Sequence, residues 1–155
     1  GVRAITLEKD DEVVAMELAE KNEELLVVTE FGYGKRTAVK EYKIQARGGK
    51  GLLTYNKSKF DKTGALIGAM VVNEQDEILL INSDGIIIRI RADEVSKLGR
   101  TTQGVKIMRV GEDSNIIALA KVVRGEDPDE DQNKSESSEK DTPDDGNDQI
   151  KIDIE

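Results

Sequence analysis

The 155-residue sequence contains no cysteine, histidine or tryptophan, and only two phenylalanines and two prolines. Without histidine or cysteine, the chain has no Ser-His-Asp or Cys-His catalytic arrangement and no zinc site with nitrogen or sulfur ligands. It has no disulfide framework, which fits a reducing compartment. No run of eighteen apolar residues occurs, so no membrane-spanning helix is expected. The chain begins with neither Met nor a basic-then-apolar leader, so we expect no signal peptide and a domain of a longer protein.

The formal net charge of -9 is unevenly distributed along the chain. Residues 125–155 contain 13 acidic residues and three lysines, which leaves residues 1–124 with a balance of +1. The acidic segment holds both prolines and, apart from three isoleucines near its end, has nothing to bury, so it cannot offset its ordering entropy. We therefore predict one folded domain over residues 1–124 and a disordered acidic tail over residues 125–155.

Basic residues concentrate between residues 32 and 62. This segment contains nine basic residues and only two acidic ones. A solvated surface is the simpler explanation for such a run. Here the run is dense, glycine-rich and nearly free of acid, which favours an anion-binding face. The basic residues are Lys35, Arg36, Lys40, Lys43, Arg47, Lys50, Lys57, Lys59 and Lys62.

The chain also repeats itself with a shift of 53 residues. Residues 24–28 (ELLVV) return as residues 77–81 (EILLI), and the same shift relates Arg36 to Arg89 and Arg47 to Arg100. Residues 14–16 resemble residues 68–70 and 117–119. A period near fifty residues is typical of propellers and related arrays. The sequence thus predicts two complete units and a partial third.

Each unit has the pattern of β-structure. Residues 25–28 and 78–81 are short, branched, apolar runs, and residues 82–85 (NSDG) form a hairpin-turn signal. The alternation in residues 88–91 places Arg89 and Arg91 on one face of a strand. We therefore predict an all-β protein in which each unit forms one blade-sized sheet. Residues 14–16 are expected to be a strand because of their similarity to the later copies.

The most specific segment is the loop of residues 45–51, with the sequence QARGGKG. Its glycines allow the backbone to approach a partner closely, with free N–H groups around Gly48 and Gly49, while Arg47 and Lys50 project from it. This segment resembles the gyrase A box, Gln-basic-Arg-Gly-Gly-basic-Gly. Residues 32–37 (GYGKRT) and 99–105 (GRTTQGV) are also similar to the family of DNA gyrase A C-terminal domains.

The resemblance covers residues 1–124 and implies a β-pinwheel, a propeller-like disc whose basic rim binds and wraps double-stranded DNA. It also implies membership of a bacterial, cytoplasmic, nucleoid-associated type II topoisomerase that introduces negative supercoils with ATP. The implied partners are the rest of the gyrase A protein and the gyrase B protein, in a heterotetramer. ATP and magnesium would bind elsewhere in that assembly, and no cofactor or metal is expected in this chain.

Two departures from the family pattern limit this inference. Ala46 replaces the first basic residue of the box, and the box lies just before the last blades rather than in the first. We therefore expect residues 45–51 to contact DNA without determining its wrapping. The family's catalytic tyrosine follows an arginine, whereas Tyr33, Tyr42 and Tyr55 do not. No catalytic residue is expected here.

The predicted mechanism is electrostatic, because lysines and arginines on outward strand faces neutralise phosphates and release counterions. Arg36 and Arg89 should occupy equivalent rim positions on successive blades. The acidic clusters at residues 10–12 and 74–77 are predicted to be solvated turns rather than metal sites. The predicted DNA-binding residues are Lys35, Arg36, Lys40, Lys43, Gln45, Arg47, Gly48, Gly49, Lys50, Gly51, Arg89, Arg91 and Arg100.

Three alternatives remain: the matching domain of topoisomerase IV, a protein-interaction propeller module, and an RNA-binding Arg-Gly-Gly segment. The intact Arg-Gly-Gly-Lys-Gly loop favours gyrase over topoisomerase IV. The RNA hypothesis is weakened because Gly-Gly occurs only once, inside a folded repeat. The acidic tail has two competing hypotheses. It either competes with DNA for the basic rim or serves only solubility.

Overall fold

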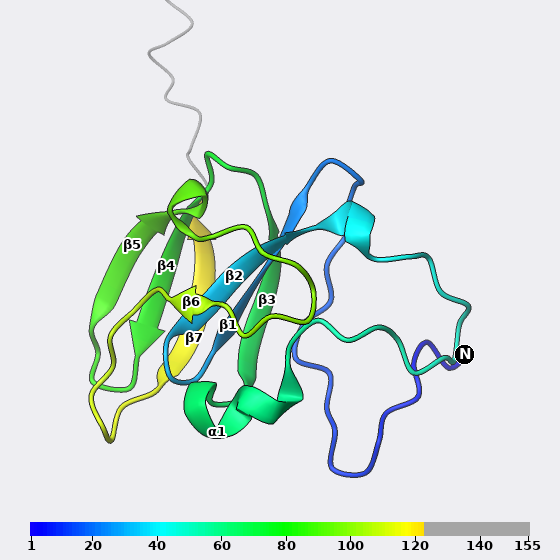
Figure 1. The fold of residues 1–155 in the computed structure, drawn as a ribbon, viewed down its shortest axis with the longest axis horizontal. Helices are drawn as coiled ribbons and strands as arrows, with labels where there is room; N and C mark the ends of the chain where they lie inside the picture. The colour runs from blue at the N-terminus through cyan, green and yellow to red at the C-terminus, as the bar shows by residue number, and fades with distance from the viewer. Residues whose placement is uncertain (123–155) are drawn as a thin grey trace, which may run out of the picture. The chain divides into compact units, whose positions relative to one another are not determined.

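The computed structural model describes residues 1–122, so the predicted disordered tail lies outside the described residues. Seven strands form two antiparallel sheets (Figure 1). The first sheet has the order β3-β1-β2-β6, with β1 at Glu24–Thr29, β2 at Tyr33–Ala38, β3 at Leu66–Val72 and β6 at Val105–Lys106. The second has the order β5-β4-β7, with β4 at Glu77–Asn82, β5 at Ile87–Arg91 and β7 at Ile116–Val122.

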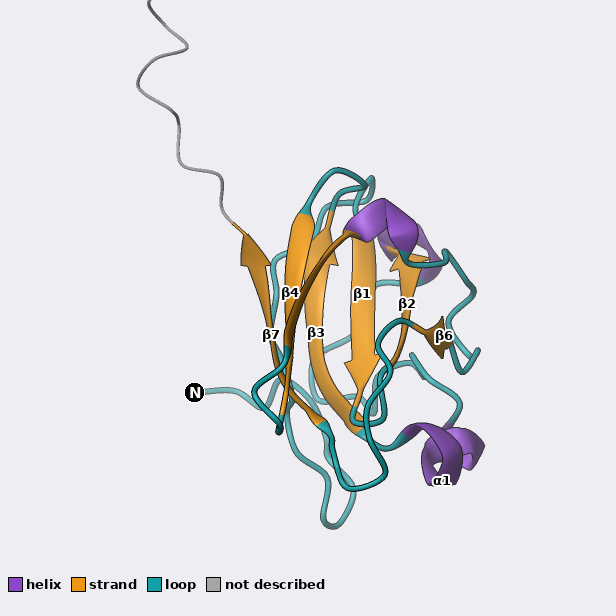
Figure 2. Cartoon of the chain, turned by 90° about the vertical axis from the view of Figure 1, so that its left-hand side faces the viewer, coloured by secondary structure: helices purple, strands orange, loops and turns teal. Residues whose placement is uncertain are grey.

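The helical content is limited to short pieces, as Figure 2 shows in purple. Single 3-10 turns lie at Val39–Glu41, Lys57–Lys59 and Ala92–Glu94, and α1 spans Phe60–Thr63. No helix within residues 1–122 is long and apolar enough to cross a membrane. The predicted all-β class is confirmed.

The predicted hairpin turn after β4 is confirmed. The side-chain oxygen of Asn82 accepts hydrogen bonds from the backbone N–H groups of Asp84 and Ile86, at 3.1 and 2.8 Å. Gly85 has a φ of 78°, which a glycine adopts without steric cost. In the following strand the two arginines are exposed and alternate with half-buried isoleucines, as the pattern indicated.

The prediction that each unit forms its own sheet is wrong at the third strand. Strand β3 belongs to the second unit but pairs with β1 of the first, with Leu26 opposite Met70. In the same way β7 of the third unit pairs with β4 of the second, with Leu80 opposite Leu119. Each sheet therefore combines a hairpin with a strand from the next unit, and the first sheet also takes β6 from the third unit. Local alternation predicts a strand but does not specify a distant pairing partner.

The predicted strand at residues 14–16 is also wrong. Its counterparts, β3 and β7, each pair with a strand of the preceding unit, and the described chain has no strand before β1. Residues 10–20 accordingly lie in an extended loop without secondary structure. Met16 and Leu18 are 93% and 96% exposed there.

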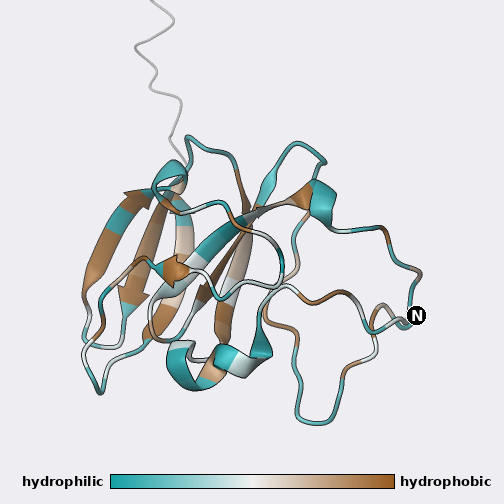
Figure 3. Cartoon of the chain, in the orientation of Figure 1, coloured by the Kyte–Doolittle hydropathy of each residue, from teal (hydrophilic) through white to brown (hydrophobic). Residues whose placement is uncertain are grey.

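Both sheets contribute to one apolar core. Leu26, Val28 and Val72 of the first sheet pack in the same cluster as Ile78 and Leu80 of the second. Figure 3 shows apolar residues on most of the strands, whereas β2 is largely polar. The sheets approach closely at Gly68, where an added Cβ would clash with the side chain of Leu119. The two sheets are thus packed tightly against each other.

Candidate nucleic-acid interface

The loop of residues 43–51 carries three exposed basic side chains of the predicted site. Lys43, Arg47 and Lys50 are all exposed. Within the described residues, none of them forms an ion pair or a side-chain hydrogen bond. Gln45, also exposed, donates its side-chain amide to the Lys43 and Ile44 carbonyls. The loop therefore presents three positive charges directly to solvent.

The backbone of this loop is held by the N-terminal segment, which runs beside it in Figure 1. The N–H of Gly48 donates to the carbonyl of Ala4 at 2.8 Å. Thr6 donates its N–H to the carbonyl of Gly49 and its hydroxyl to the carbonyl of Gly48. Gly48 and Gly51 have φ values of 75° and 77°. The expectation of a free N–H at Gly48 is therefore wrong, because that group already has an acceptor.

Two of the predicted DNA contacts are buried instead of facing outward. Lys35 is 0% exposed and Arg36 is 5% exposed. The Lys35 amine donates to the carbonyls of Gly99 and Arg100 and lies 5.6 Å from the ring centre of Tyr55. Neither side chain lies on an outward strand face. The second unit covers both of them, and this contact could not be recognised from residue type alone.

Burial also changes the titration of Lys35. It lowers the pKa of the amine from 10.5 to about 8, an effect that Glu41 opposes and Arg100 reinforces. Burial likewise raises the pKa of Tyr55, whose hydroxyl donates to the carbonyl of Gln103. These two groups form a polar contact beneath the loop of residues 99–104.

Arg36 takes part in a buried ion pair. Its guanidinium binds Glu24, and the two side chains are only 6% and 7% exposed. The same guanidinium donates to the carbonyl of Val95 at 2.8 Å, and Glu24 also binds Lys97. The repeat-equivalent pair is half-buried, with the Arg89 side chain 55% exposed and the Glu77 side chain 16% exposed. Arg36 and Arg89 are thus equivalent in sequence but differ in environment.

Four further predicted residues remain accessible to different degrees. Lys40, Arg89 and Arg91 are exposed, but Arg89 pairs with Glu77, and Arg91 forms a two-pronged pair with Asp93 at 3.0 and 2.6 Å. These acidic partners partly neutralise the β5 arginines. Arg100 is half-buried and donates to the carbonyl of Leu53 at 3.0 Å.

The sequence did not predict that two basic side chains lie together beside Tyr33. Lys62 and Lys106 are both exposed and lie 5.8 and 5.1 Å from the ring centre of Tyr33. Tyr33 and Lys106 are opposite one another in the β2–β6 pairing. Lys62 was at least part of the basic run, whereas nothing in the sequence associates Lys106 with it.

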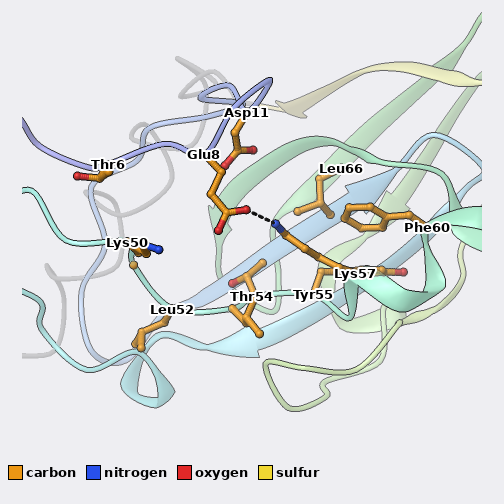
Figure 4. Close-up of a pocket in the computed structure, with 12 residues that line it drawn as sticks. Thr6, Glu8, Asp11, Lys50, Leu52, Thr54, Tyr55, Lys57, Phe60 and Leu66 are labelled. Atoms are coloured by element: carbon orange, nitrogen blue, oxygen red, sulfur yellow. Dashed lines mark ion pairs between the residues drawn. The ribbon is translucent and has the colours of Figure 1, made fainter.

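One cavity of about 380 Å³ adjoins the 43–51 loop (Figure 4). Lys57 crosses it to pair with Glu8 at 3.7 Å. Its lining mixes polar and apolar groups and contains no nucleophile with an adjacent base. Across residues 1–122, no group of three or more acidic side chains is placed to hold a metal ion. The lining residues are Thr6, Glu8, Asp11, Lys50, Gly51, Leu52, Leu53, Thr54, Tyr55, Lys57, Phe60 and Leu66.

Comparison with known proteins identifies relatives across this whole region. A family described as "DNA gyrase C-terminal domain, beta-propeller" matches residues 1–20, 23–73 and 76–122. The DNA gyrase A protein of Staphylococcus aureus (strain NCTC 8325 / PS 47) is 38% identical over 151 residues, 96% of this chain and 17% of that protein. The DNA gyrase A protein of Mycolicibacterium smegmatis is 40% identical over 125 residues, 81% of this chain and 14% of that protein. The chain thus spans about one sixth of these relatives.

Solved structures agree with this assignment. A DNA gyrase A C-terminal domain superposes with a TM-score of 0.63 at 32% identity, covering 67% of this chain and 35% of that one. The C-terminal domain of a DNA topoisomerase IV superposes with a TM-score of 0.72 at 23% identity, covering 79% of this chain and 38% of that one. The second likeness concerns the fold alone.

Proposed function

Because the chain belongs to the DNA gyrase C-terminal domain family, we propose that residues 1–122 bind duplex DNA through phosphate contacts made by the loop of residues 43–51. The observation that carries this proposal is the set of three exposed, unneutralised cations, Lys43, Arg47 and Lys50, on one backbone loop. A phosphate that approaches the loop displaces counterions from all three. Binding of this kind is tolerant of sequence and depends strongly on salt.

The remaining accessible cations extend this surface. Lys40 follows β2, and Arg89 and Arg91 lie on β5. For the two arginines, phosphate must compete with Glu77 and Asp93, so their contribution should be smaller than that of the loop. Bending 20–30 base pairs costs on the order of 1–6 kcal/mol, so several contacts must act together. Two successive units supply such contacts.

In the intact enzyme we assign this chain the role of holding and bending DNA. The complete protein would be gyrase A, acting with gyrase B in a cytoplasmic type II topoisomerase that uses ATP to introduce negative supercoils. ATP and magnesium would bind in other parts of that assembly. The chain's own contribution is electrostatic, and cleavage chemistry would reside elsewhere in the protein.

Topoisomerase IV is the nearest alternative, since its C-terminal domain has the same fold. Two observations favour gyrase. The Arg47-Gly-Gly-Lys50-Gly segment is complete, and the identity to gyrase A proteins reaches 38–40%. A protein-interaction module is the alternative of a different class, and it predicts duplex binding that is weak and nearly independent of salt.

A salt titration of duplex binding tests the proposal. We would compare the full chain with the Arg47→Ala, Lys50→Ala and Lys43→Ala variants. Arg109→Ala is the matched control, because Arg109 is exposed and carries the same charge but lies in the loop between β6 and β7. Each loop variant should reduce the slope of log affinity against log salt by about 0.9. Slopes that stay unchanged, or that fall equally for Arg109→Ala, would refute the loop as the contact.

A further inference from the structure

Three consecutive polar side chains of β2, on its two faces, all bind the second unit. Lys35 donates to the carbonyls of Gly99 and Arg100, at 2.7 Å for the former. Thr37 donates to the carbonyl of Leu98 at 2.8 Å. Arg36 reaches the carbonyls of Val95 and, at 3.3 Å, Asp93. All three side chains therefore donate to one backbone segment, residues 93–100, while Arg36 also pairs with Glu24.

Backbone contacts fix the same segment. The N–H of Arg36 donates to Ser96, and the N–H of Leu98 donates back to the carbonyl of Arg36, at 3.0 and 2.8 Å. Further along, the Tyr55 hydroxyl donates to Gln103, and Gly104 lies so close to Gly34 that an added Cβ would be 2.6 Å from its carbonyl oxygen. The loop of residues 99–104 is thus anchored at both ends.

The anchored loop is connected to the loop proposed to bind DNA. Arg100 donates to the carbonyl of Leu53 and lies 5.8 Å from the ring centre of Tyr42. Leu53 follows the 43–51 loop by two residues. Lys35 contacts both sides of this junction, since its amine binds the Arg100 carbonyl and faces the ring of Tyr55. One buried amine therefore lies where two loops from successive units meet.

The second unit does not repeat this arrangement. The shift of 53 residues places Ile88 at the position of Lys35, and Ile88 is half-buried in the apolar core. The strand geometry alone therefore accepts an apolar side chain at this position. A buried lysine is costly unless its charge is matched by acceptors. The two carbonyls and the tyrosine ring supply that match in the first unit.

We infer that Lys35 is a positioning residue that holds the loop of residues 99–104 against the 51–55 segment, so that Arg100 and the cations of the adjoining 43–51 loop contact the same duplex. This inference rests on the proposed function and deepens it. Lys35 itself touches no DNA, because it is fully buried. It acts through Arg100 and through the backbone of the loop that carries Arg100.

Amide hydrogen exchange on the DNA-free full chain provides the first test, with Lys35→Met as the variant. Methionine keeps much of the side-chain length and removes the donors. The loss of two charge-assisted hydrogen bonds should accelerate exchange in residues 98–104 by at least about tenfold. Lys40→Met is the matched control, since it removes the same charge from an exposed position. It should leave exchange in this loop unchanged.

Duplex affinity in a double-mutant cycle provides the second test. If Lys35 acts through the loop, Lys35→Met should weaken binding about three- to tenfold alone and by less than about twofold in an Arg100→Ala background. A direct phosphate contact would instead give additive losses and unchanged exchange, which would overturn the inference. A structural effect confined to stability would accelerate exchange without lowering affinity, and would also overturn it.

A second variant covers the case in which Lys35→Met fails to fold. Tyr55→Phe keeps every charge and removes the hydroxyl that donates to Gln103. It should also accelerate exchange in residues 98–104 and weaken duplex binding. The two proposals fail separately. If the unaltered chain binds duplex without a salt slope, the proposed function fails. If the loop exchanges at the same rate in Lys35→Met and Tyr55→Phe as in the unaltered chain, the positioning role fails.

Discussion

The two copies of the Glu–Arg pair offer a measurement in which the protein supplies its own control. Glu24 and Arg36 are related by the 53-residue shift to Glu77 and Arg89, and both pairs bring carboxylate and guanidinium together. The first pair is buried, with side chains 7% and 6% exposed, whereas Arg89 of the second is 55% exposed. The perturbation is Glu24→Gln in one variant and Glu77→Gln in the other.

The expected magnitudes follow from these environments. Glutamine keeps the volume of glutamate, so no cavity forms, but it loses the charge and exchanges one acceptor oxygen for an NH2 donor. In Glu24→Gln the pair with Lys97 is lost together with the pair to Arg36. In Glu24→Gln the Arg36 charge remains buried with carbonyl acceptors alone, and breaking a buried pair from one side costs roughly 3–5 kcal/mol. We expect the lower end, about 3 kcal/mol, because the bonds to Val95 and Asp93 persist. In Glu77→Gln the arginine is hydrated, and the loss should be about 1 kcal/mol or less.

Urea unfolding of the full chain measures both losses, as midpoint shifts at constant slope. Repeating the titrations in about 1 M salt should reduce the small loss and leave the large one nearly unchanged, since buried pairs are poorly screened. Equal losses in the two variants, or a loss below about 1 kcal/mol for Glu24→Gln, would refute the argument that the second unit buries this pair.

The remaining predictions concern two glycines of positive φ, two isoleucines of different burial and the buried Lys35 amine. Gly32→Ala should destabilise by at least about 1 kcal/mol more than Gly85→Ala, because both glycines have positive φ but only Gly32 faces a backbone carbonyl, that of Met108; chemical denaturation checks this. Ile78→Ala, in the core, should cost about 2–5 kcal/mol, and Ile87→Ala, 60% exposed, about 0.5 kcal/mol, by the same assay. Burial lowers the pKa of Lys35 from 10.5 to about 8, so between these pH values the unfolded chain binds more protons than the folded chain. The free energy of unfolding should therefore rise with pH in this range, by at most about 3 kcal/mol. Lys35→Met should remove this rise, measured up to about pH 9.5 to avoid Tyr55, whose raised pKa acts in the opposite direction above about pH 10.

Local features of the fold could be predicted from the sequence. Branched apolar runs gave the positions of β1 and β4, and the Asn82–Gly85 turn and the alternation in β5 followed from turn chemistry and strand period. The origin of the third strand in each sheet could not be predicted, because pairing between units depends on tertiary contacts. The isolated similarity of residues 14–16 to β3 failed for the same reason, since a strand needs a partner.

The candidate site was predictable where side chains face solvent and not where another unit covers them. Arg47 and Lys50 are exposed as expected, whereas Lys35 and Arg36, in the same basic run, are buried. One signal in the sequence does distinguish them. Ile88 occupies the repeat position of Lys35, and an apolar residue in one copy indicates that this position faces inward in both. No comparable signal marks Arg36, because its counterpart is also an arginine.

The different environments of Arg36 and Arg89 show that equivalence in a repeat does not imply equivalence at the surface. Arg36 is buried because residues 93–98 of the second unit lie across β2 and supply its acceptors. Arg89 stays exposed because, within residues 1–122, no segment of a following unit lies across β5. Whether the arginine at this repeat position faces solvent or is buried between two units is therefore decided by the neighbouring unit. A basic residue at such a position can be assigned a role only once its contacts with that neighbour are known.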